Sequence, residues 1–196
     1  MGNPDRDKWN ARYREAERAP PLPARVLQEN LHLLPARGAA LDLASGLGGN
    51  ALLLARSGLR THAWDIAEEA LTLLRGFAAQ QGLEIATQAR DVAAAPPEPG
   101  SFDVIVISRF LERALAPALV RALRPGGLLF YQTFIRESVT DEGPRRPEFR
   151  LAPNELLSLF NELHVLVYRE EGQVGDVTRG WRNEALLVAQ SRGRFA

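Results

Sequence analysis

A glycine-rich turn, Ser45–Asn50, is the part of the sequence whose spacing most clearly indicates chemistry. Gly46, Gly48 and Ala51 follow the G-x-G-x-x-A spacing that occurs where a backbone passes close to a nucleotide at the start of a helix. Glycine suits such a turn because it has no Cβ to obstruct the ligand. Asp65 follows Gly46 by 19 residues, close to the offset expected for a carboxylate that binds ribose hydroxyls. The spacing therefore predicts a site for a nucleotide cofactor.

Two further acidic residues distinguish between the cofactors that fit this spacing. Asp42 stands just before the glycines, inside an apolar segment, where its charge would repel a pyrophosphate but suit a cofactor with ammonium and sulfonium groups. Asp91 follows a later strand-like segment and is placed to accept a hydrogen bond from an adenine amino group. Both residues favour S-adenosylmethionine (AdoMet). NAD would share the turn and Asp65 but would leave Asp42 and Asp91 unexplained.

These residues must be positioned by short apolar segments that alternate with longer amphipathic ones, a pattern typical of an α/β fold with a mainly parallel sheet. Strands are predicted at Ala39–Ala44, Arg60–Asp65, Leu83–Gln88, Phe102–Ser108, Leu128–Thr133, His164–Arg169 and Glu184–Gln190. Helices are predicted at Ala51–Ser57, around the apolar stripe Ala70, Leu73, Leu74 and Phe77, at Pro117–Arg124 and at Pro153–Phe160. The last two strands have no predicted helix between them and should be antiparallel.

The order and spacing of these motifs resemble those of the class I AdoMet-dependent methyltransferases, from about Trp9 to Gln190. LDLASGLGG resembles the first motif of that family, the strand end at Trp64-Asp65 the second, Arg90-Asp91-Val92 the third, FDVIVIS the fourth and LRPGGLLFYQTF the stretch into the fifth strand. Within the superfamily the chain is most similar to the small bacterial TehB-like (tellurite-resistance type) and thiopurine-methyltransferase-like group, whose W-[DN]-x-R-Y segment is matched by Trp9–Tyr13.

The resemblance implies a fold class and a division of the chain. The fold would be a doubly wound, Rossmann-like, mainly parallel seven-stranded sheet with an antiparallel last strand. Residues 1–35 would form an N-terminal helical cover segment, and residues 36–196 the AdoMet-dependent methyltransferase domain of a single-domain protein.

At the methionine end of AdoMet the resemblance implies several contacts. Gly46 and Gly48 would pack against the ribose and the methionine portion, and Asp42 would orient that end through water or the amino group. Ser108 would lie near the methionine amine and the transferable methyl group. The chain departs from the family's D-x-G-x-G-x-G pattern at Ala44, which replaces the first glycine. Alanine is small enough that we expect cofactor binding to survive.

At the adenosine end the resemblance implies that Asp65 binds the ribose hydroxyls and that Ile66 contacts the adenine face. Asp91 would bind the adenine amine and the Val92 amide a ring nitrogen. The product would be S-adenosylhomocysteine (AdoHcy). No metal site is expected.

The composition restricts what could accept the methyl group. The 24 basic and 24 acidic residues leave no formal net charge, which argues against a nucleic-acid partner. The absence of cysteine excludes a covalent mechanism of the cytosine-C5 type. No apolar run approaches the roughly 18 residues that span a bilayer, and the charged N-terminus lacks the apolar core of a signal peptide. We therefore expect a cytoplasmic protein with no membrane partner. The sequence leaves the oligomeric state open between a monomer and a weak dimer.

The expected acceptor is a small molecule, soft or anionic, that offers sulfur, oxygen or a chalcogen oxyanion. Arg109 follows the strand Phe102–Ser108 and could hold an anion, although an ion pair with Glu112 is the alternative. The polar loop Arg136–Arg150 would close over the same end, as a mobile cover together with Trp9–Tyr13, and would bring further arginines: Arg145, Arg146 and Arg150. Solvated roles are favoured for Arg145 and Arg146.

Two other classes of function share part of this pattern. A non-catalytic AdoMet-binding regulatory or scaffold protein would have every cofactor residue and lack only a productive acceptor site. A nicotinamide-dependent oxidoreductase is less favoured, because NAD would leave the positions of Asp42 and Asp91 unexplained.

Overall fold

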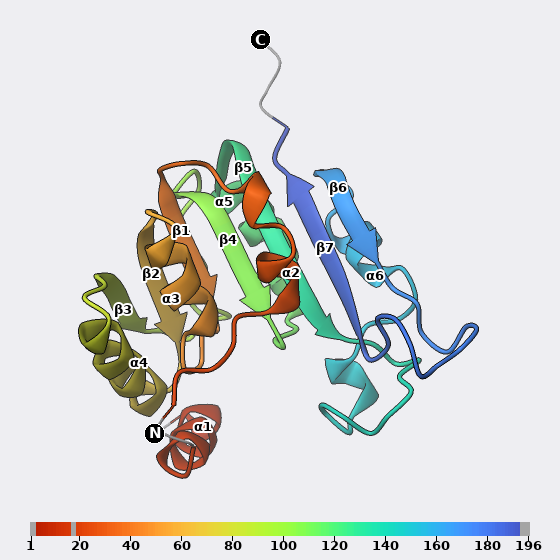
Figure 1. Cartoon of the computed structure of the whole chain (residues 1–196), viewed down its shortest axis with the longest axis horizontal. Coiled ribbons are helices and arrows are strands. Elements are labelled where there is room, and N and C mark those ends of the chain that lie inside the picture. Colours follow the sequence, from red (N-terminus) through yellow and green to blue (C-terminus); the bar gives the residue numbers. More distant parts are fainter. Residues whose placement is uncertain (1–2, 17–18, 193–196) are drawn as a thin grey trace.

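The computed structural model describes residues 3–16 and 19–192. They form a seven-stranded sheet in the order β3-β2-β1-β4-β5-β7-β6, with helices on both faces (Figure 1). The strands are β1 (Ala39–Leu43), β2 (Arg60–Asp65), β3 (Ile85–Ala89), β4 (Phe102–Ser108), β5 (Leu123–Phe134), β6 (His164–Arg169) and β7 (Glu184–Gln190). Each predicted strand is present, and the predicted doubly wound architecture is confirmed.

Strand direction follows from the connections between the strands. β1 pairs in parallel with β2 and β4, β2 with β3, and β4 with β5. The central strands β1 and β4 are almost wholly buried, as expected for a parallel sheet covered on both faces. Residues 170–183, between β6 and β7, contain no helix that could carry the chain across the sheet. β7 is accordingly antiparallel to both of its neighbours, β5 and β6, as predicted.

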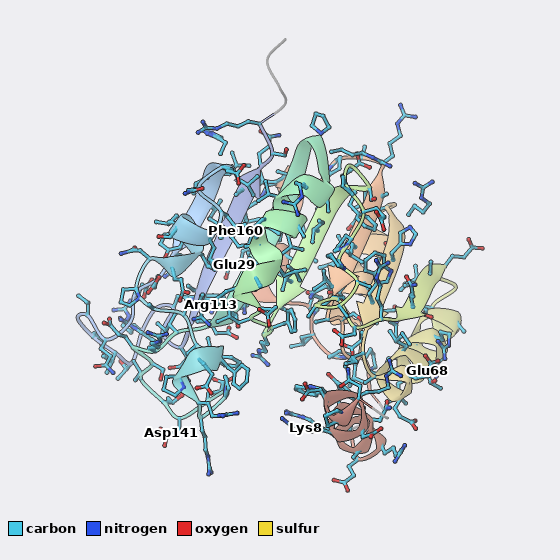
Figure 2. All side chains as sticks on the ribbon, turned by 180° about the vertical axis from the view of Figure 1, so that it is seen from behind. Lys8, Glu29, Glu68, Arg113, Asp141 and Phe160 are labelled. Carbon is cyan, nitrogen blue, oxygen red and sulfur yellow. The ribbon has the colours of Figure 1, made fainter. Side chains whose placement is uncertain are left out.

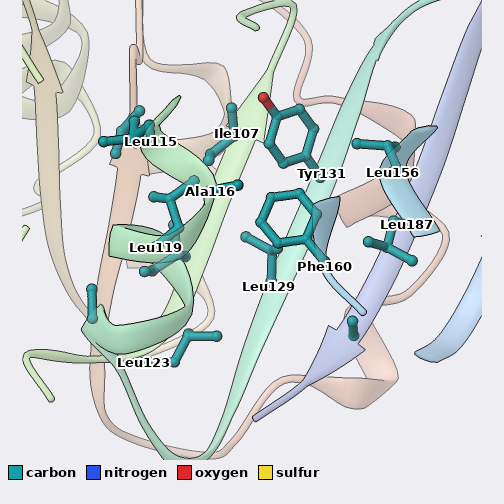
Figure 3. Packing of buried hydrophobic residues seen from close by; sticks show 14 of the residues in the cluster. Ile107, Leu115, Ala116, Leu119, Leu123, Leu129, Tyr131, Leu156, Phe160 and Leu187 are labelled. Carbon is teal, nitrogen blue, oxygen red and sulfur yellow. The ribbon is translucent and has the colours of Figure 1, made fainter. Parts of the chain in front are cut away.

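The helices form one layer on each face of the sheet. One face carries α2 (Arg25–Gln28), α3 (Gly49–Arg56) and α4 (Glu68–Gln80), and the other carries η2 (Arg113–Leu115), α5 (Ala116–Ala122) and α6 (Glu155–Leu159). Alternate residues of β4 serve the two layers, since Val104 packs toward α2 and α3 whereas Ile105 packs toward α5. Figure 3 shows the second layer, where the rings of Tyr131 and Phe160 lie 5.5 Å apart. None of the helices in the described ranges is long and apolar enough to cross a membrane.

Several predicted boundaries differ from the structure. β5 begins at Leu123, five residues before its predicted start, because Leu123 pairs with Phe102 and the breaker residues Pro125–Gly127 form an irregularity within the strand. Local sequence predicts a break there, but Gly126 and Gly127 exchange backbone hydrogen bonds with Ser191 and remain at the sheet. α3 starts two residues earlier than predicted, and α6 is shorter than its predicted range.

The N-terminal helix α1 (Pro4–Arg14) lies at the carboxyl ends of the parallel strands (Figure 1). It is the predicted helix around Trp9–Tyr13, and it buries none of its residues fully. Asn3 caps it by accepting hydrogen bonds from the amides of Asp5 and Arg6. Its contacts with the domain are polar, since Asn10 accepts from the Glu69 amide at 3.1 Å and Arg14 pairs with the Glu69 carboxylate at 3.0 Å.

The loop after β5, which includes η3 (Pro147–Phe149), lies at the same end of the sheet as α1, as the labels Asp141 and Lys8 show in Figure 2. Arg150 is only 8% exposed. Its guanidinium donates to the backbone oxygens of Ile135, Glu142 and Pro144 at 2.9, 2.6 and 2.7 Å. The prediction that Arg150 faces an anionic acceptor is therefore wrong, because its donors hold the two ends of the loop together. Sequence alone could not reveal this, since its partners are backbone atoms.

We expect Arg150→Ala to lower the free energy of unfolding by about 2–3 kcal/mol, since three backbone carbonyls, that of Ile135 buried and the other two part-buried, lose a charged donor. Chemical denaturation measures this change. Arg145→Ala is the matched control, because Arg145 is exposed and its loss should change stability by less than about 0.5 kcal/mol. Equal effects of the two substitutions would show that Arg150 does not hold the loop.

Candidate cofactor-binding site

Two buried carboxylates mark the carboxyl ends of β1 and β2. Asp42 is 1% exposed and Asp65 is 6% exposed. The glycine-rich turn follows β1 directly and lies between them in the chain. Both carboxylates are satisfied mainly by backbone amides of the segments that follow these strands, so the turn and the acids form one unit.

Asp42 holds the start of α3. Its Oδ2 accepts from the Ala51 amide at 3.0 Å, and its Oδ1 accepts from Asn50 Nδ2 at 3.2 Å. Burial raises the pKa of Asp42 to about 8, against the opposing effect of these two donors. The carboxylate thus lies beneath Asn50 rather than at the surface of the turn.

Asp65 holds the turn itself. Its Oδ2 accepts from the Gly46 amide at 2.7 Å and its Oδ1 from the Ala67 amide at 2.8 Å. Burial raises the pKa of Asp65 above its ordinary value, and the backbone donors of Ala67 and Gly46 act in the opposite direction. Each oxygen of the carboxylate has a lone pair beyond the one that these amides use.

The turn requires left-handed backbone at three positions. Gly46 and Gly48 have φ values of 52° and 78°, and Ala44 has a φ of 55°. The last value explains why a glycine is expected there, since an L-residue with a Cβ is strained in this conformation. A Cβ at Gly48 would clash with the Leu74 side chain, so this glycine also permits α4 to pack. A Cβ at Gly46 would instead meet the Tyr13 hydroxyl of α1 at 2.8 Å.

Tyr13 and Asn3 bring the α1 region onto the site. Burial raises the pKa of Tyr13 to about 12, and the nearby Asp65 charge acts in the same direction. Asn3 Nδ2 donates to Asp91 Oδ2 at 3.0 Å, while Asp91 Oδ1 accepts from the amides of Ala93 and Ala94. The structure therefore brings the predicted site residue Asp91 to the same edge as Asp65, beneath the N-terminal segment.

The remaining predicted residues continue this edge. Ile66 follows Asp65 and is half-buried, and Val92 follows Asp91 and is buried. Ser108 ends β4 and accepts from Asn50 Nδ2 at 3.1 Å. Within the described residues, Ser45 Oγ is buried without a hydrogen-bond partner.

Asn50 is a residue that the sequence analysis missed. Its Nδ2 donates to Asp42 and Ser108, and its Oδ1 accepts from the Ala24 amide at 2.8 Å. Residues 21–26, here called the N-terminal strap, are thereby fixed against α3. A signal was present, because Asn50 is polar in the otherwise apolar helix GNALLLA.

Arg109 and its partners occupy the other half of the carboxyl edge. Arg109 Nε lies 3.1 Å from Glu184 Oε1, and Arg109 Nη2 lies 3.6 Å from Glu142 Oε1. Arg109 therefore pairs with Glu184 and Glu142, and not with Glu112 as the alternative prediction had it. Glu184 Oε2 accepts from Gln132 Nε2 at 2.6 Å. Neither Gln132 nor Glu184 was singled out from the sequence, because their pairing depends on the register of β5 and β7.

Comparison with known proteins gives this geometry a context. Residues 40–127 match the family model of a methyltransferase domain. The ubiquinone biosynthesis O-methyltransferase of Idiomarina loihiensis is 32% identical over 102 residues, which cover 49% of this chain and 42% of that protein. Six curated relatives of this name are matched over 42–56% of their lengths, so the chain spans about half of each.

Solved structures share the whole fold. TehB from Haemophilus influenzae superposes with a TM-score of 0.71 at 21% identity, over 94% of this chain and 67% of that one. A SAM-dependent methyltransferase from Methanosarcina mazei gives a TM-score of 0.68 at 19% identity, over 89% of this chain and 100% of that one. Residues 40–127 thus match a methyltransferase domain, and the described chain shares the fold of solved AdoMet-dependent methyltransferases. The predicted resemblance to class I AdoMet-dependent methyltransferases and the likeness of fold to TehB are confirmed, and a methyltransferase domain of this family implies AdoMet as the cofactor.

The first position of the methyltransferase glycine motif provides a stability test. We expect Ala44→Gly to raise the free energy of unfolding by about 0.5–1 kcal/mol, because glycine relieves the left-handed strain at φ 55°. Ala51→Gly is the matched control, since the same change inside α3 should cost about 1 kcal/mol. A loss of stability in both variants would contradict strain at Ala44.

Proposed function

We propose that this chain transfers the methyl group of AdoMet to a small sulfur, oxygen or chalcogen-oxyanion nucleophile. The observation that carries the proposal is the pair of buried carboxylates, Asp42 and Asp65, at neighbouring strand ends that flank a glycine turn. Ligands of open α/β sheets bind at the carboxyl ends of the strands, where these groups lie.

The chemistry of the site suits the adenosine part of AdoMet. Asp65 would accept from the ribose hydroxyls with the lone pairs that Gly46 and Ala67 leave free. Asp91 would accept from the adenine amine, with the Val92 amide on a ring nitrogen and Ile66 against the ring face. Tyr13, which lies over Gly46, would be part of the cover above this half.

The methionine part would lie along the turn toward Ser108. Gly46 and Gly48 would allow its close approach, and Ala44 fulfils the role of the first glycine by adopting the same left-handed backbone. Asp42 would act on the cationic end of the cofactor through Asn50, since Asp42 is only 1% exposed and its Oδ1 accepts from Asn50 Nδ2.

AdoMet, when bound, supplies an electrophilic methyl group. The contribution of the chain to such a displacement is alignment of the acceptor and exclusion of water. α1 and the loop 136–150 lie at the end of the sheet where a cover would have to lie. Restricting their motion through Asn10, Asn3 and Arg150 would keep the site dry.

Two observations bear on the acceptor. The balanced charge disfavours nucleic acid. The curated relatives carry the name O-methyltransferase, which supports oxygen as one acceptor atom. A non-catalytic AdoMet-binding protein remains the second candidate, and it would bind the cofactor without transfer to any acceptor.

Asp65→Asn tests the assignment of the ribose contact. It keeps the size of the side chain but removes a charge and one acceptor, so we expect AdoMet and AdoHcy to bind about ten- to a hundredfold more weakly in calorimetry. Because Asp65 also holds two backbone amides, the melting temperature of the cofactor-free protein should fall as well.

The matched control for this variant is Asp103→Asn. Asp103 likewise accepts from a backbone amide, that of Ala39 at 2.7 Å, but it does so at the opposite ends of the strands. This control should lose stability and keep its affinity for AdoHcy. Unchanged affinity in Asp65→Asn would show that the ribose is held elsewhere.

The proposed function itself is tested by calorimetry and a transfer assay together. The protein should bind AdoHcy and not NAD, and it should transfer a labelled methyl group to at least one member of a panel of small thiols, phenols, selenite and tellurite. Binding of AdoHcy without transfer to any panel member would favour the non-catalytic alternative. Binding of NAD without AdoHcy would overturn the methyltransferase proposal.

A further inference from the structure

We propose that Glu184 takes the proton of the methyl acceptor, which is therefore a neutral hydroxyl or thiol compound rather than an oxyanion. The inference rests on the proposed function and narrows its acceptor class. It comes from a network of polar side chains between β4, β5, β7 and the N-terminal strap, in which Gln132 is buried and Arg109 is exposed.

The orientation of Gln132 fixes what faces Glu184. Gln132 is 3% exposed on β5, and its Oε1 accepts from the Val26 amide of the strap at 2.9 Å. Because that backbone donor requires the amide oxygen, the Nε2 group must point to the other side, where it donates to Glu184 Oε2 at 2.6 Å. A glutamine held in this way presents a donor to an ionised carboxylate. Glu184 is thus set in place before any acceptor arrives.

Arg109 completes this positioning. It has a φ of 55°, a conformation that is unusual for a residue with a side chain and that clusters at active sites and ligand clamps. Its amide donates to the Gln132 carbonyl at 2.8 Å, and its Nε donates to Glu184 Oε1 at 3.1 Å. Its guanidinium also faces Glu142 and lies over the Phe134 ring at 5.6 Å.

The charge balance of this cluster disfavours an oxyanion. One guanidinium, Arg109, faces two carboxylates, those of Glu184 and Glu142, so its charge is already compensated. An arriving anion would have to displace one of these pairs. A neutral acceptor that donates a hydrogen bond would instead find an oriented carboxylate whose side chain is 12% exposed.

Glu184 is also joined to the cofactor half of the site. Gln132 pairs with Ser108 in the register of β4 and β5, and Asn50 connects Ser108 to Asp42. A continuous polar row therefore runs along the carboxyl edge from Asp42 to Glu184. This places Glu184 beside the residues proposed to hold the methyl-bearing end of AdoMet.

In the proposed reaction AdoMet is the methyl donor and Glu184 is the proton acceptor. The acceptor oxygen or sulfur forms a bond to the methyl carbon while the bond from that carbon to the sulfonium breaks, and its electron pair stays on sulfur. The acceptor proton passes to the Glu184 carboxylate and then to solvent. Arg109 and Gln132 keep that carboxylate directed at the acceptor.

Two probes separate proton removal from a structural role. Catechol is neutral near pH 7 and needs a base, whereas 4-nitrothiophenol is already a thiolate at that pH. We expect Glu184→Gln to lower kcat for catechol about a hundredfold or more and to leave kcat for the thiolate within about threefold. Glu184→Asp should restore part of the transfer to catechol.

The control variant is Glu142→Gln, which removes the other carboxylate beside Arg109, one whose side chain is 55% exposed. It should keep the rate with catechol within about threefold. AdoHcy affinity, measured by calorimetry, should stay within about twofold in every variant. A wild-type protein that does not bind AdoHcy would instead count against the proposed function.

Three results would overturn the role of Glu184. One is an equal loss of transfer to both probes in Glu184→Gln with AdoHcy affinity retained, which indicates a structural ion pair. Another is an unchanged rate with catechol in that variant. The third is a wild-type protein that binds AdoHcy but methylates neither catechol nor a thiol, whether or not it methylates selenite or tellurite.

Discussion

The arrangement of the site depends on two carboxylates that are buried where their strands end. A carboxyl group removed from water must be hydrogen-bonded, or its burial destabilises the fold. Asp42 and Asp65 obtain their donors from the segments that follow β1 and β2, namely from Ala51, Asn50, Gly46 and Ala67. The path of the glycine turn is thereby fixed, including its left-handed positions. A site that could cradle a nucleoside is thus a consequence of satisfying two buried acids.

The second half of the site is built on side-chain amides. Asn50 and Gln132 each accept from a backbone amide of the N-terminal strap and each donate to the polar row of the carboxyl edge. A segment that precedes the sheet in sequence is in this way tied to β5 and α3. The strap carbonyls of Pro21 and Leu22 lie so close to Gly49 that a Cβ there would be 2.8 Å from both. A displacement of the strap would therefore disturb both Asn50, beside Asp42, and Gln132, beside Glu184.

Much of the fold, and the position of the predicted site residues along one edge of the sheet, could be predicted from the sequence. Apolar periodicity located the seven strands, and the spacing between Gly46 and Asp65 is a local signal that does not depend on tertiary structure. The cluster of Arg109, Gln132 and Glu184 could not be predicted in the same way. Glu184 lies 75 residues from Arg109, and only the pairing of β7 with β5 brings them together. Arg150 was assigned to the site because a guanidinium suits an anion, but its partners are backbone carbonyls that no sequence pattern reveals.

The central claim is that AdoMet binds on the turn between Asp42 and Asp65, and a crystal structure of the full chain with AdoHcy tests it most directly. The ribose hydroxyls should lie within hydrogen-bond distance of Asp65, the adenine beside Asp91 and Val92, and the sulfur atom near Ser108. Tyr13 should shift from its position over Gly46 to cover the ligand. AdoHcy bound elsewhere on the protein, with the contacts of Asp65 and Tyr13 unchanged, would contradict the account.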